Sequence, residues 1–230
     1  MQRGADDLDA IRQVVNQVLE AHAEEEGGQR SQARAEILIH SMHVFAQRGL
    51  NRTTVQHLLD AAEVSRRTFY KYFRNKMDVL ESIYRIFIDN MLLHFHKEMR
   101  QSRSAKEIIR NTTQVYFDYH VSMGPVIKLM MEEARASGSA LAPHRARAQR
   151  IAADVLTAEI GRLTGRDMDP LVMRTMLWIL ENYSLYIFED GEFSAERLAQ
   201  CQRAMVGISE AVLLGGDATV ALLERSEEEE

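Results

Sequence analysis

The stretch "TTVQHLLDAAEVSRRTFYKYFRNK", residues 53–76, decides the fold because it predicts two short helices joined by a tight turn. Thr53 can cap the first helix, and Gln56, three residues later, can complete a capping box. Ser65 can cap the second helix, and only "EVS" separates the two patterns. Two short helices with so tight a connection are typical of a helix-turn-helix motif.

The second of these helices carries two different faces. When each residue is turned by about 100° from the last, Phe69 and Phe73 form an inward pair. The opposite arc holds five residues: Arg66, Arg67, Tyr70, Lys71 and Arg74. A helix of this size, with exposed cations, suits the major groove of DNA.

The charge of the chain is distributed unevenly around this motif. The net charge is -6. Residues 30–77, however, contain nine Lys or Arg against three acids, whereas residues 1–29 contain two against seven. A basic block within an acidic chain is expected for a polyanion-binding head on a non-binding body, although a solvated basic surface is an equal alternative on charge alone.

The rest of the chain also reads as helical. It has only three prolines, and no sustained alternation of apolar and polar residues indicates strands. We expect an all-α protein with four parts: an N-terminal extension or leader over 1–29, a helix-turn-helix domain over 30–77, a helical ligand-binding and dimerisation domain over 78–216, and an acidic tail over 217–230. Leu8, Ile11 and Val15 lie on one stripe of a possible helix in the extension.

Further helix starts are predicted at three polar residues. Ser104 with Glu107 forms a capping box, Asn75 can cap a helix with Asp78 in its first turn, and Ser194 begins the last full helix.

Several other classes of protein are disfavoured. No apolar run approaches the ~20 residues that span a bilayer, and the acidic N-terminus is unlike a signal peptide. A single cysteine, Cys201, allows no internal disulfide, which fits the cytoplasm. No cofactor motif, metal-ligand cluster or nucleophile elbow is present, so we expect neither a metal site nor an enzyme.

Two helical segments of the body are rich in methionine and aromatic residues with a few polar tips. Such side chains can line an apolar ligand cavity, although plain helical core is the more common role of any one of them. The candidate ligand-binding residues are Tyr116, Tyr119, His120, Met123, Met130, Trp178, Asn182, Tyr183 and Tyr186.

The run from Ile37 to Leu80 resembles the N-terminal domain of the TetR family of bacterial transcriptional regulators. The similarity rests on Phe45 and Gly49, Thr53-Thr54-Val55, Ala62, Val64-Ser65, Thr68-Phe69-Tyr70, Tyr72-Phe73, Lys76 and Leu80. It departs from the family at Leu59, where a small residue is usual, and at Glu63, where glycine is usual. A non-glycine residue in a left-handed turn costs about 1–2 kcal/mol, which predicts a distorted or longer turn.

The resemblance implies an N-terminal three-helix DNA-binding domain followed by a helical bundle. It further implies a homodimer that binds a palindromic operator and forms its interface through the helices at 170–189 and 194–214. The DNA-contacting residues would be Arg52, Thr53, Thr54, Ser65, Arg66, Arg67, Thr68, Tyr70, Lys71, Tyr72 and Lys76. Those at the start of the second helix would lie nearest the base edges, and Tyr70, Tyr72 and Lys76 would hold phosphates.

The family resemblance leads us to expect a repressor that a partly apolar small molecule releases from DNA. One alternative is a ligand-independent or activating DNA-binding regulator whose C-terminal domain serves a protein partner. The other is a helical-bundle enzyme with an incidental basic end.

Overall fold

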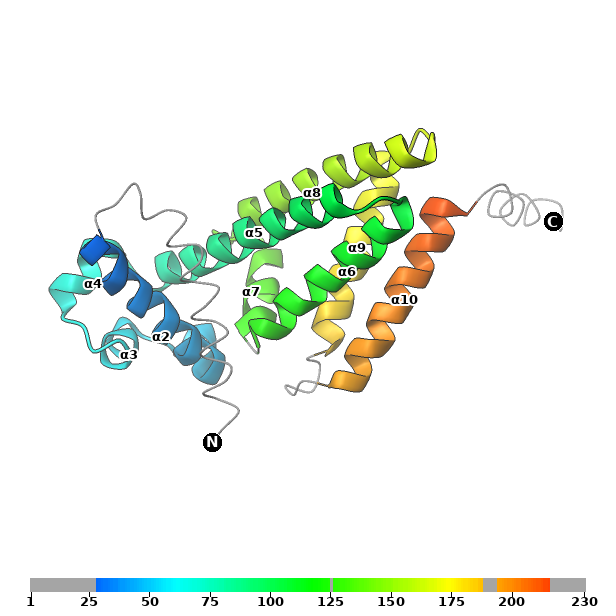
Figure 1. Cartoon of the computed structure of the whole chain (residues 1–230). Helices are drawn as coiled ribbons and strands as arrows, with labels where there is room; N and C mark the ends of the chain where they lie inside the picture. Colours follow the sequence, from blue (N-terminus) through cyan, green and yellow to red (C-terminus); the bar gives the residue numbers. More distant parts are fainter. Residues whose placement is uncertain (1–27, 125, 188–193, 216–230) are drawn as a thin grey trace. The chain divides into compact units, whose positions relative to one another are not determined.

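The computed structural model describes residues 28–124, 126–187 and 194–215, and these ranges contain α-helices and no strand. In chain order the helices are α2 (Gly28–Arg52), α3 (Val55–Ala61), α4 (Arg66–Tyr72), α5 (Lys76–Gln101), α6 (Ala105–Ser122), α7 (Val126–Arg135), α8 (Ala142–Thr164), α9 (Pro170–Ile187) and α10 (Ala195–Leu214) (Figure 1). The all-α class is confirmed. The helical stripe expected near the N-terminus and the acidic tail lie outside the described residues.

The chain divides into two compact units. The first unit contains the described residues up to Leu92 together with Tyr119–Ala148. The second contains Leu93–Asp118, the described residues from Gln149 to Ile187, and those from Ser194 onward. The domain boundary expected after residue 77 falls just inside α5 and stays a prediction.

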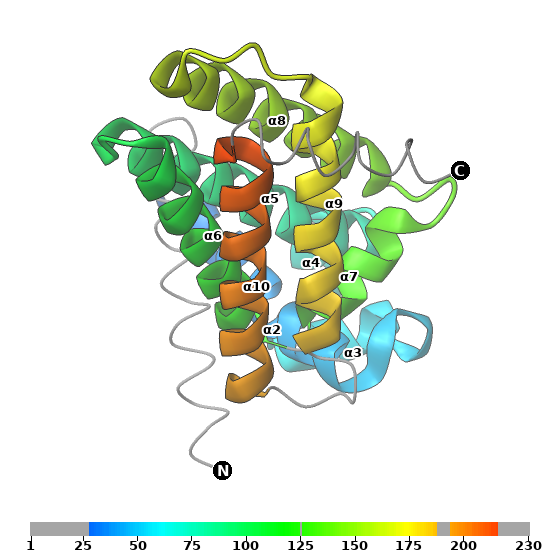
Figure 2. The same ribbon diagram turned by 90° about the vertical axis from the view of Figure 1, so that its right-hand side faces the viewer.

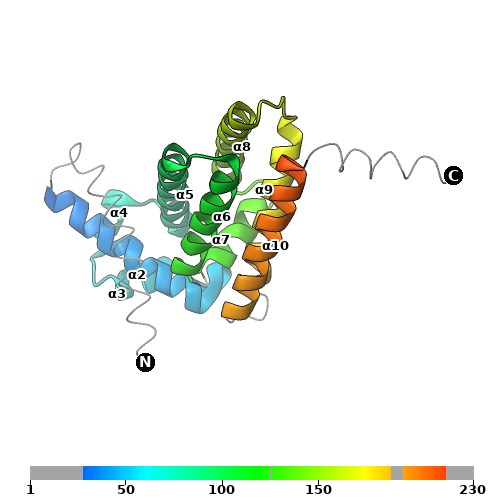
Figure 3. The ribbon, with the colours of Figure 1, turned by 45° about the vertical axis from the view of Figure 1, so that its right-hand side comes forward.

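In the first unit, α2 packs against α3, α4 and α7 (Figure 3). Gly49 interrupts α2 with a φ of 68° and a ψ of 170°, a left-handed φ that glycine adopts readily. The Arg34 guanidinium lies 5.7 Å from the centre of the Phe73 ring, which helps to fix the end of α4 against α2.

In the second unit, α9 runs beside α10 (Figure 2). Glu210 of α10 accepts the Arg110 guanidinium at 2.9 Å and the Lys106 ammonium at 3.2 Å, so two cations of α6 share one carboxylate. The two ion pairs therefore join α6 to α10.

The helix starts predicted at Asn75, Ser104 and Ser194 are confirmed. The Asn75 Oδ1 accepts from the Asp78 N–H at 3.0 Å, and the Ser104 Oγ accepts from the Glu107 N–H at 3.2 Å. The Ser194 Oγ likewise accepts from the Arg197 N–H at 3.2 Å. Each bond satisfies a backbone donor that the first turn of a helix leaves open.

None of the helices in the described ranges combines the length and the apolar character needed to cross a bilayer.

Candidate nucleic-acid interface and ligand cavity

The first helix of the motif begins one residue later than the sequence predicted. Thr54 rather than Thr53 is the N-cap of α3, and its hydroxyl accepts from the His57 N–H at 3.3 Å. His57 returns the bond, because its Nδ1 accepts from the Thr54 N–H at 3.2 Å. The expected capping box is present, but His57 fills the place assigned to Gln56.

The turn between α3 and α4 contains Glu63 in the left-handed conformation, with a φ of 52°. The Val64 N–H donates to the Leu59 carbonyl at 3.2 Å, and this bond closes the end of α3 as in a Schellman motif. Such motifs usually have glycine at the position that Glu63 occupies, because a side chain is strained there. The turn is formed at the expense of backbone strain at this residue.

Replacing Glu63 with glycine is therefore expected to stabilise the first unit. Removal of the left-handed strain gains about 1–2 kcal/mol, and the greater freedom of glycine in the unfolded chain takes back about 0.5–1 kcal/mol. The free energy of unfolding, measured by urea titration, should rise by about 0.75 kcal/mol, the middle of a net range of about 0–1.5 kcal/mol. Glu63→Ala is the control, since it retains Cβ. Equal midpoints for the two variants would contradict the strain.

The second helix, α4, is anchored by its aromatic side chains. Ser65 caps it, and the Ser65 Oγ accepts from the Thr68 N–H at 3.1 Å. Phe69 and Phe73 are buried with their ring centres 5.8 Å apart, which confirms the inward pair. The helix ends at Tyr72, earlier than the pattern suggested. Arg74 consequently leaves the outward arc and pairs with Asp78 at 3.4 Å.

The outward face of α4 contains two arginines, of which one side chain is held by a hydrogen bond and the other is not. Arg66 Nη2 donates to Gln56 Oε1 at 2.8 Å, so its guanidinium is held against α3. Arg67 is exposed, and no hydrogen bond or ion pair joins it to another described residue. Tyr70 is 52% exposed, and the Lys71 ammonium lies 5.2 Å from the centre of the Tyr72 ring. One face of a short helix therefore exposes hydrogen-bond donors and positive charge together.

Two of the residues expected to contact DNA, Thr53 and Lys76, form hydrogen bonds within the motif. The Lys76 Nζ donates to the carbonyls of Leu50 and Thr53, each at 2.7 Å. Thr53 is buried, and its hydroxyl donates to the Gly49 carbonyl at 2.7 Å. These bonds fasten the start of α5 to the break between α2 and α3.

The remaining predicted DNA contacts lie around the same motif. Arg52 and Thr54 are exposed at the junction between α2 and α3, and Ser65 is exposed at the start of α4. Thr68 and Tyr72 are half-buried. Gln56 is a site residue that the sequence reasoning assigned only to capping, and its bond to Arg66 spans ten positions that no helical period connects.

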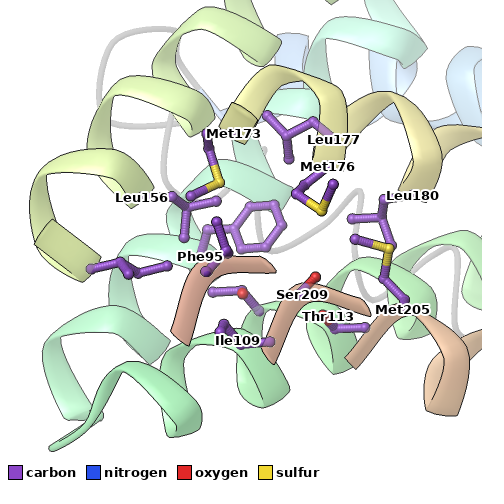
Figure 4. A pocket seen from close by; sticks show the side chains of 13 residues that line it. Phe95, Ile109, Thr113, Leu156, Met173, Met176, Leu177, Leu180, Met205 and Ser209 are labelled. Atoms are coloured by element: carbon purple, nitrogen blue, oxygen red, sulfur yellow. The ribbon is translucent and has the colours of Figure 1, made fainter. Parts of the chain in front are cut away.

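A cavity of about 30 Å³ lies within the second unit, between α5, α6, α8, α9 and α10 (Figure 4). Its lining is mostly aliphatic and thioether, with three hydroxyl residues and no charged side chain. The residues are Phe95, Ile109, Thr112, Thr113, Leu156, Ile160, Met173, Met176, Leu177, Leu180, Met205, Ser209 and Leu213. The volume accommodates about one or two waters, and the pliable methionines can move to admit more.

The nine residues predicted to bind a ligand are not gathered at this cavity, and none of them lines it. Tyr119 and His120 pack on Phe87 in the first unit, where Met123 and Met130 are also buried. Tyr116 is buried in the second unit, with its hydroxyl 3.3 Å from the Ser184 hydroxyl. On α9, Trp178, Asn182 and Tyr186 are exposed and Tyr183 is half-buried.

The sequence carried a weaker signal for the residues that line this cavity. Thr113 and Ser209 each stand at an inward position of an amphipathic helix, four residues from Ile109 and Met205 respectively.

Metal binding has no support among the described residues, since nowhere in them do three His, Cys, Asp or Glu side chains come together. His40 pairs with Glu36 at 3.3 Å, and the His43 ring bonds the Gln47 amide at 2.6 Å.

Comparison with known proteins identifies the helix-turn-helix segment. Residues 37–83 match the family model described as bacterial regulatory proteins, tetR family. Over this segment the chain matches the TetR family. The match contains all of α3 and α4, the turn between them, most of α2 and the start of α5.

The curated proteins similar to this chain include both a transcriptional activator and a transcriptional repressor. The transcriptional activator FasR of Mycolicibacterium smegmatis is 25% identical over 97 residues, 41% of this chain and 44% of FasR. The transcriptional repressor KstR2 of Rhodococcus jostii is 29% identical over 92 residues, 39% of this chain and 45% of KstR2. The match thus spans less than half the length of each curated relative.

The fold of the TetR-family regulators extends over most of the chain. The fatty acid degradation regulator FadR of Bacillus halodurans superposes with a TM-score of 0.67 at 20% identity, covering 84% of this chain and 98% of FadR. FadR of Bacillus subtilis, in complex with stearoyl-CoA, superposes with a TM-score of 0.65 at 18% identity and covers 78% of this chain and 97% of that protein.

Proposed function

We propose that the chain is a homodimeric, sequence-specific DNA-binding transcriptional regulator, and that a small, largely apolar ligand releases it from a palindromic operator. The observation that carries the proposal is the exposed face of α4, with Arg66 and Arg67 on a helix anchored by Phe69 and Phe73. Arginine can bind the O6 and N7 acceptors of guanine with two bonds, which makes these side chains the base-reading candidates.

The remaining proposed contacts position the helix-turn-helix on the DNA duplex. Arg52, Lys71 and the hydroxyls of Thr54 and Tyr70 are exposed donors around α4 and suit phosphate oxygens. Thr53 and Lys76 act indirectly in this proposal, because their polar atoms hold the backbone that presents those donors.

The dimer is proposed to form through α9 and α10. Leu171, Trp178 and Tyr186 are 56%, 45% and 44% exposed and lie within an arc of about 80° on α9. On α10, Ala204, Gly207 and Ala211 are exposed, and a Cβ added at Gly207 would meet no atom within 4 Å. A large apolar surface beside a small-residue surface suits close packing against the same two helices of a second copy.

The ligand is proposed to enter the cavity of the second unit. Its apolar lining is consistent with a flexible hydrocarbon chain, and the fold is shared with a FadR in complex with stearoyl-CoA. For release, the ligand must bind the DNA-free state more tightly than the DNA-bound state, since equal affinity shifts nothing.

Selection of bound fragments from the host's genomic DNA tests the DNA-binding proposal. The recovered fragments should share two inverted half-sites, with centres one helical turn of about 34–36 Å, or a multiple of it, apart. Fragments without a common sequence, recovered at physiological salt, would contradict sequence-specific binding.

Activation is a second candidate, because the FasR relative is named an activator. Transcription from a recovered operator, measured with and without the protein, separates the two signs. A repressor lowers transcription of the reporter and an activator raises it.

A further inference from the structure

Two hydroxyl groups face the cavity of the second unit without a partner in the protein. Thr113 of α6 and Ser209 of α10 are 5% and 4% exposed, and both line the cavity. Neither side chain forms a hydrogen bond with any residue in the described ranges. In Figure 4 both lie on the side of the cavity away from Met173 and Leu177.

The third hydroxyl of the lining provides an internal comparison. Thr112 Oγ1 donates to the Ile108 carbonyl at 2.6 Å, the usual way in which a helical threonine satisfies its hydroxyl. Thr113 and Ser209 do not make this bond to their own helices. A buried hydroxyl without a partner costs about 1–3 kcal/mol, so a water or a ligand atom in the cavity would stabilise these two groups by accepting their hydrogen bonds.

The surrounding contacts keep the two hydroxyls in place. Ser209 is followed directly by Glu210, which holds Lys106 and Arg110 of α6 through ion pairs of 3.2 and 2.9 Å. Thr113 is three residues after Arg110 on the same helix. The two helix segments that carry the hydroxyls are thus linked beside the cavity.

We propose that the ligand of this cavity carries one uncharged oxygen, such as the carbonyl of a ketone, ester or thioester, within an otherwise apolar body. This oxygen accepts hydrogen bonds from Thr113 and Ser209, and the aliphatic and thioether side chains surround the hydrocarbon. No cation lines the cavity, so a carboxylate there would lose its hydration without gaining a counter-charge. The inference rests on the proposed ligand-responsive function and specifies the chemistry of its site.

The cavity volume supports a replacement of water by the ligand. About 30 Å³ holds one or two waters, which can bond both hydroxyls in the ligand-free protein. A carbonyl oxygen reproduces those bonds when it displaces the water, whereas a hydrocarbon does not. The two hydroxyls therefore select for an oxygen at this point of the ligand.

Binding of 2-octanone, octanoate and octane to the full-length protein tests the inference. The isosteric Thr113→Val variant and the Ser209→Ala variant, which removes the hydroxyl, should each weaken 2-octanone binding about three- to tenfold, the usual loss of one neutral hydrogen bond. Octane binding should stay within about twofold in both variants. Thr112→Val is the matched control and should leave the preference for 2-octanone unchanged, since its hydroxyl already bonds Ile108.

An infrared measurement reports the bond directly. The carbonyl stretch of bound, 13C-labelled 2-octanone should lie at lower wavenumber in the parent and in Thr112→Val than in the Thr113→Val/Ser209→Ala double variant. An unchanged stretch and unchanged affinities in the double variant would overturn the inference and leave the hydroxyls to water. Octanoate binding more tightly than 2-octanone would also overturn it.

Failure of the proposed function gives a different result. If 2-octanone binds as expected but neither it nor a longer ketone changes the affinity for operator DNA, the cavity chemistry stands and ligand-controlled release does not.

Discussion

Replacing Arg66 and Arg67 together with alanine is expected to lower affinity for the operator by at least about thirtyfold, because each bidentate contact of arginine with guanine contributes about 1–3 kcal/mol of discrimination. Affinity for unrelated DNA should fall much less, since it depends on the total number of phosphate contacts. Fluorescence anisotropy with operator and scrambled duplexes, at several salt concentrations, measures both quantities.

Arg85→Ala is the matched control for this experiment. Arg85 is exposed on α5, outside the face of α4, and no ion pair connects it to another described residue. Its removal lowers the charge of the first unit without touching the proposed reading surface. The assignment of α4 as the reading helix would fail if the double variant bound operator within about twofold of the Arg85→Ala protein.

The Gln56 side chain distinguishes the two arginines of this surface. It fixes the Arg66 guanidinium at 2.8 Å, so part of the entropy cost of ordering this arginine is met before DNA binds. Arg67 has no such tie. The two arginines therefore differ in how much order DNA must impose on them, although they are neighbours in the sequence.

The second large effect is expected at the proposed dimer interface, where Trp178→Arg should convert the dimer into a 26.3 kDa monomer at micromolar concentration. Central interface tryptophans commonly contribute about 2–4 kcal/mol. A two-fold interface contains each substitution twice, so the dimer dissociation constant should rise by at least about a thousandfold. Sedimentation velocity measures the change, and operator affinity should fall with it.

Leu93→Arg provides the control for Trp178→Arg. Leu93 is 63% exposed on α5, so the control places the same new charge at an exposed apolar residue on a different helix. The Leu93→Arg protein should remain a dimer. Equal sedimentation of parent, Leu93→Arg and Trp178→Arg would show that α9 does not form the interface.

The helix-turn-helix could be predicted from the sequence because its signals are local. The cap at Ser65 and the inward pair of Phe69 and Phe73 depend only on spacing along one helix, and all three are confirmed. The error at Thr53 is also instructive. From the sequence, either of the two adjacent threonines could be the N-cap. In the structure the Thr53 hydroxyl donates to the carbonyl of Gly49, where α2 is interrupted, and Thr54 caps α3.

The cavity could not be predicted from the sequence in the same way. Aromatic and methionine side chains fill a core as readily as they line a cavity. The presence of residues such as Tyr116 and Trp178 in the sequence therefore did not locate the cavity. The cavity depends on which side chains of five helices fail to meet, and that is a property of packing between distant segments. Lys76 could not be placed from sequence either, since its partners are 23 and 26 residues away.

The position of Lys76 has a practical consequence for mapping the DNA surface by chemical modification. Amine-reactive reagents acylate a lysine only where its amine is accessible, and hydrogen bonds to two backbone carbonyls hold the Lys76 amine within the motif. Lys71 has no such carbonyl partners and is exposed. In a footprint, slow modification of Lys76 in the free protein would therefore report its hydrogen bonds to the two carbonyls. Only a decrease in the modification rate of Lys71 on addition of DNA would report contact with the duplex.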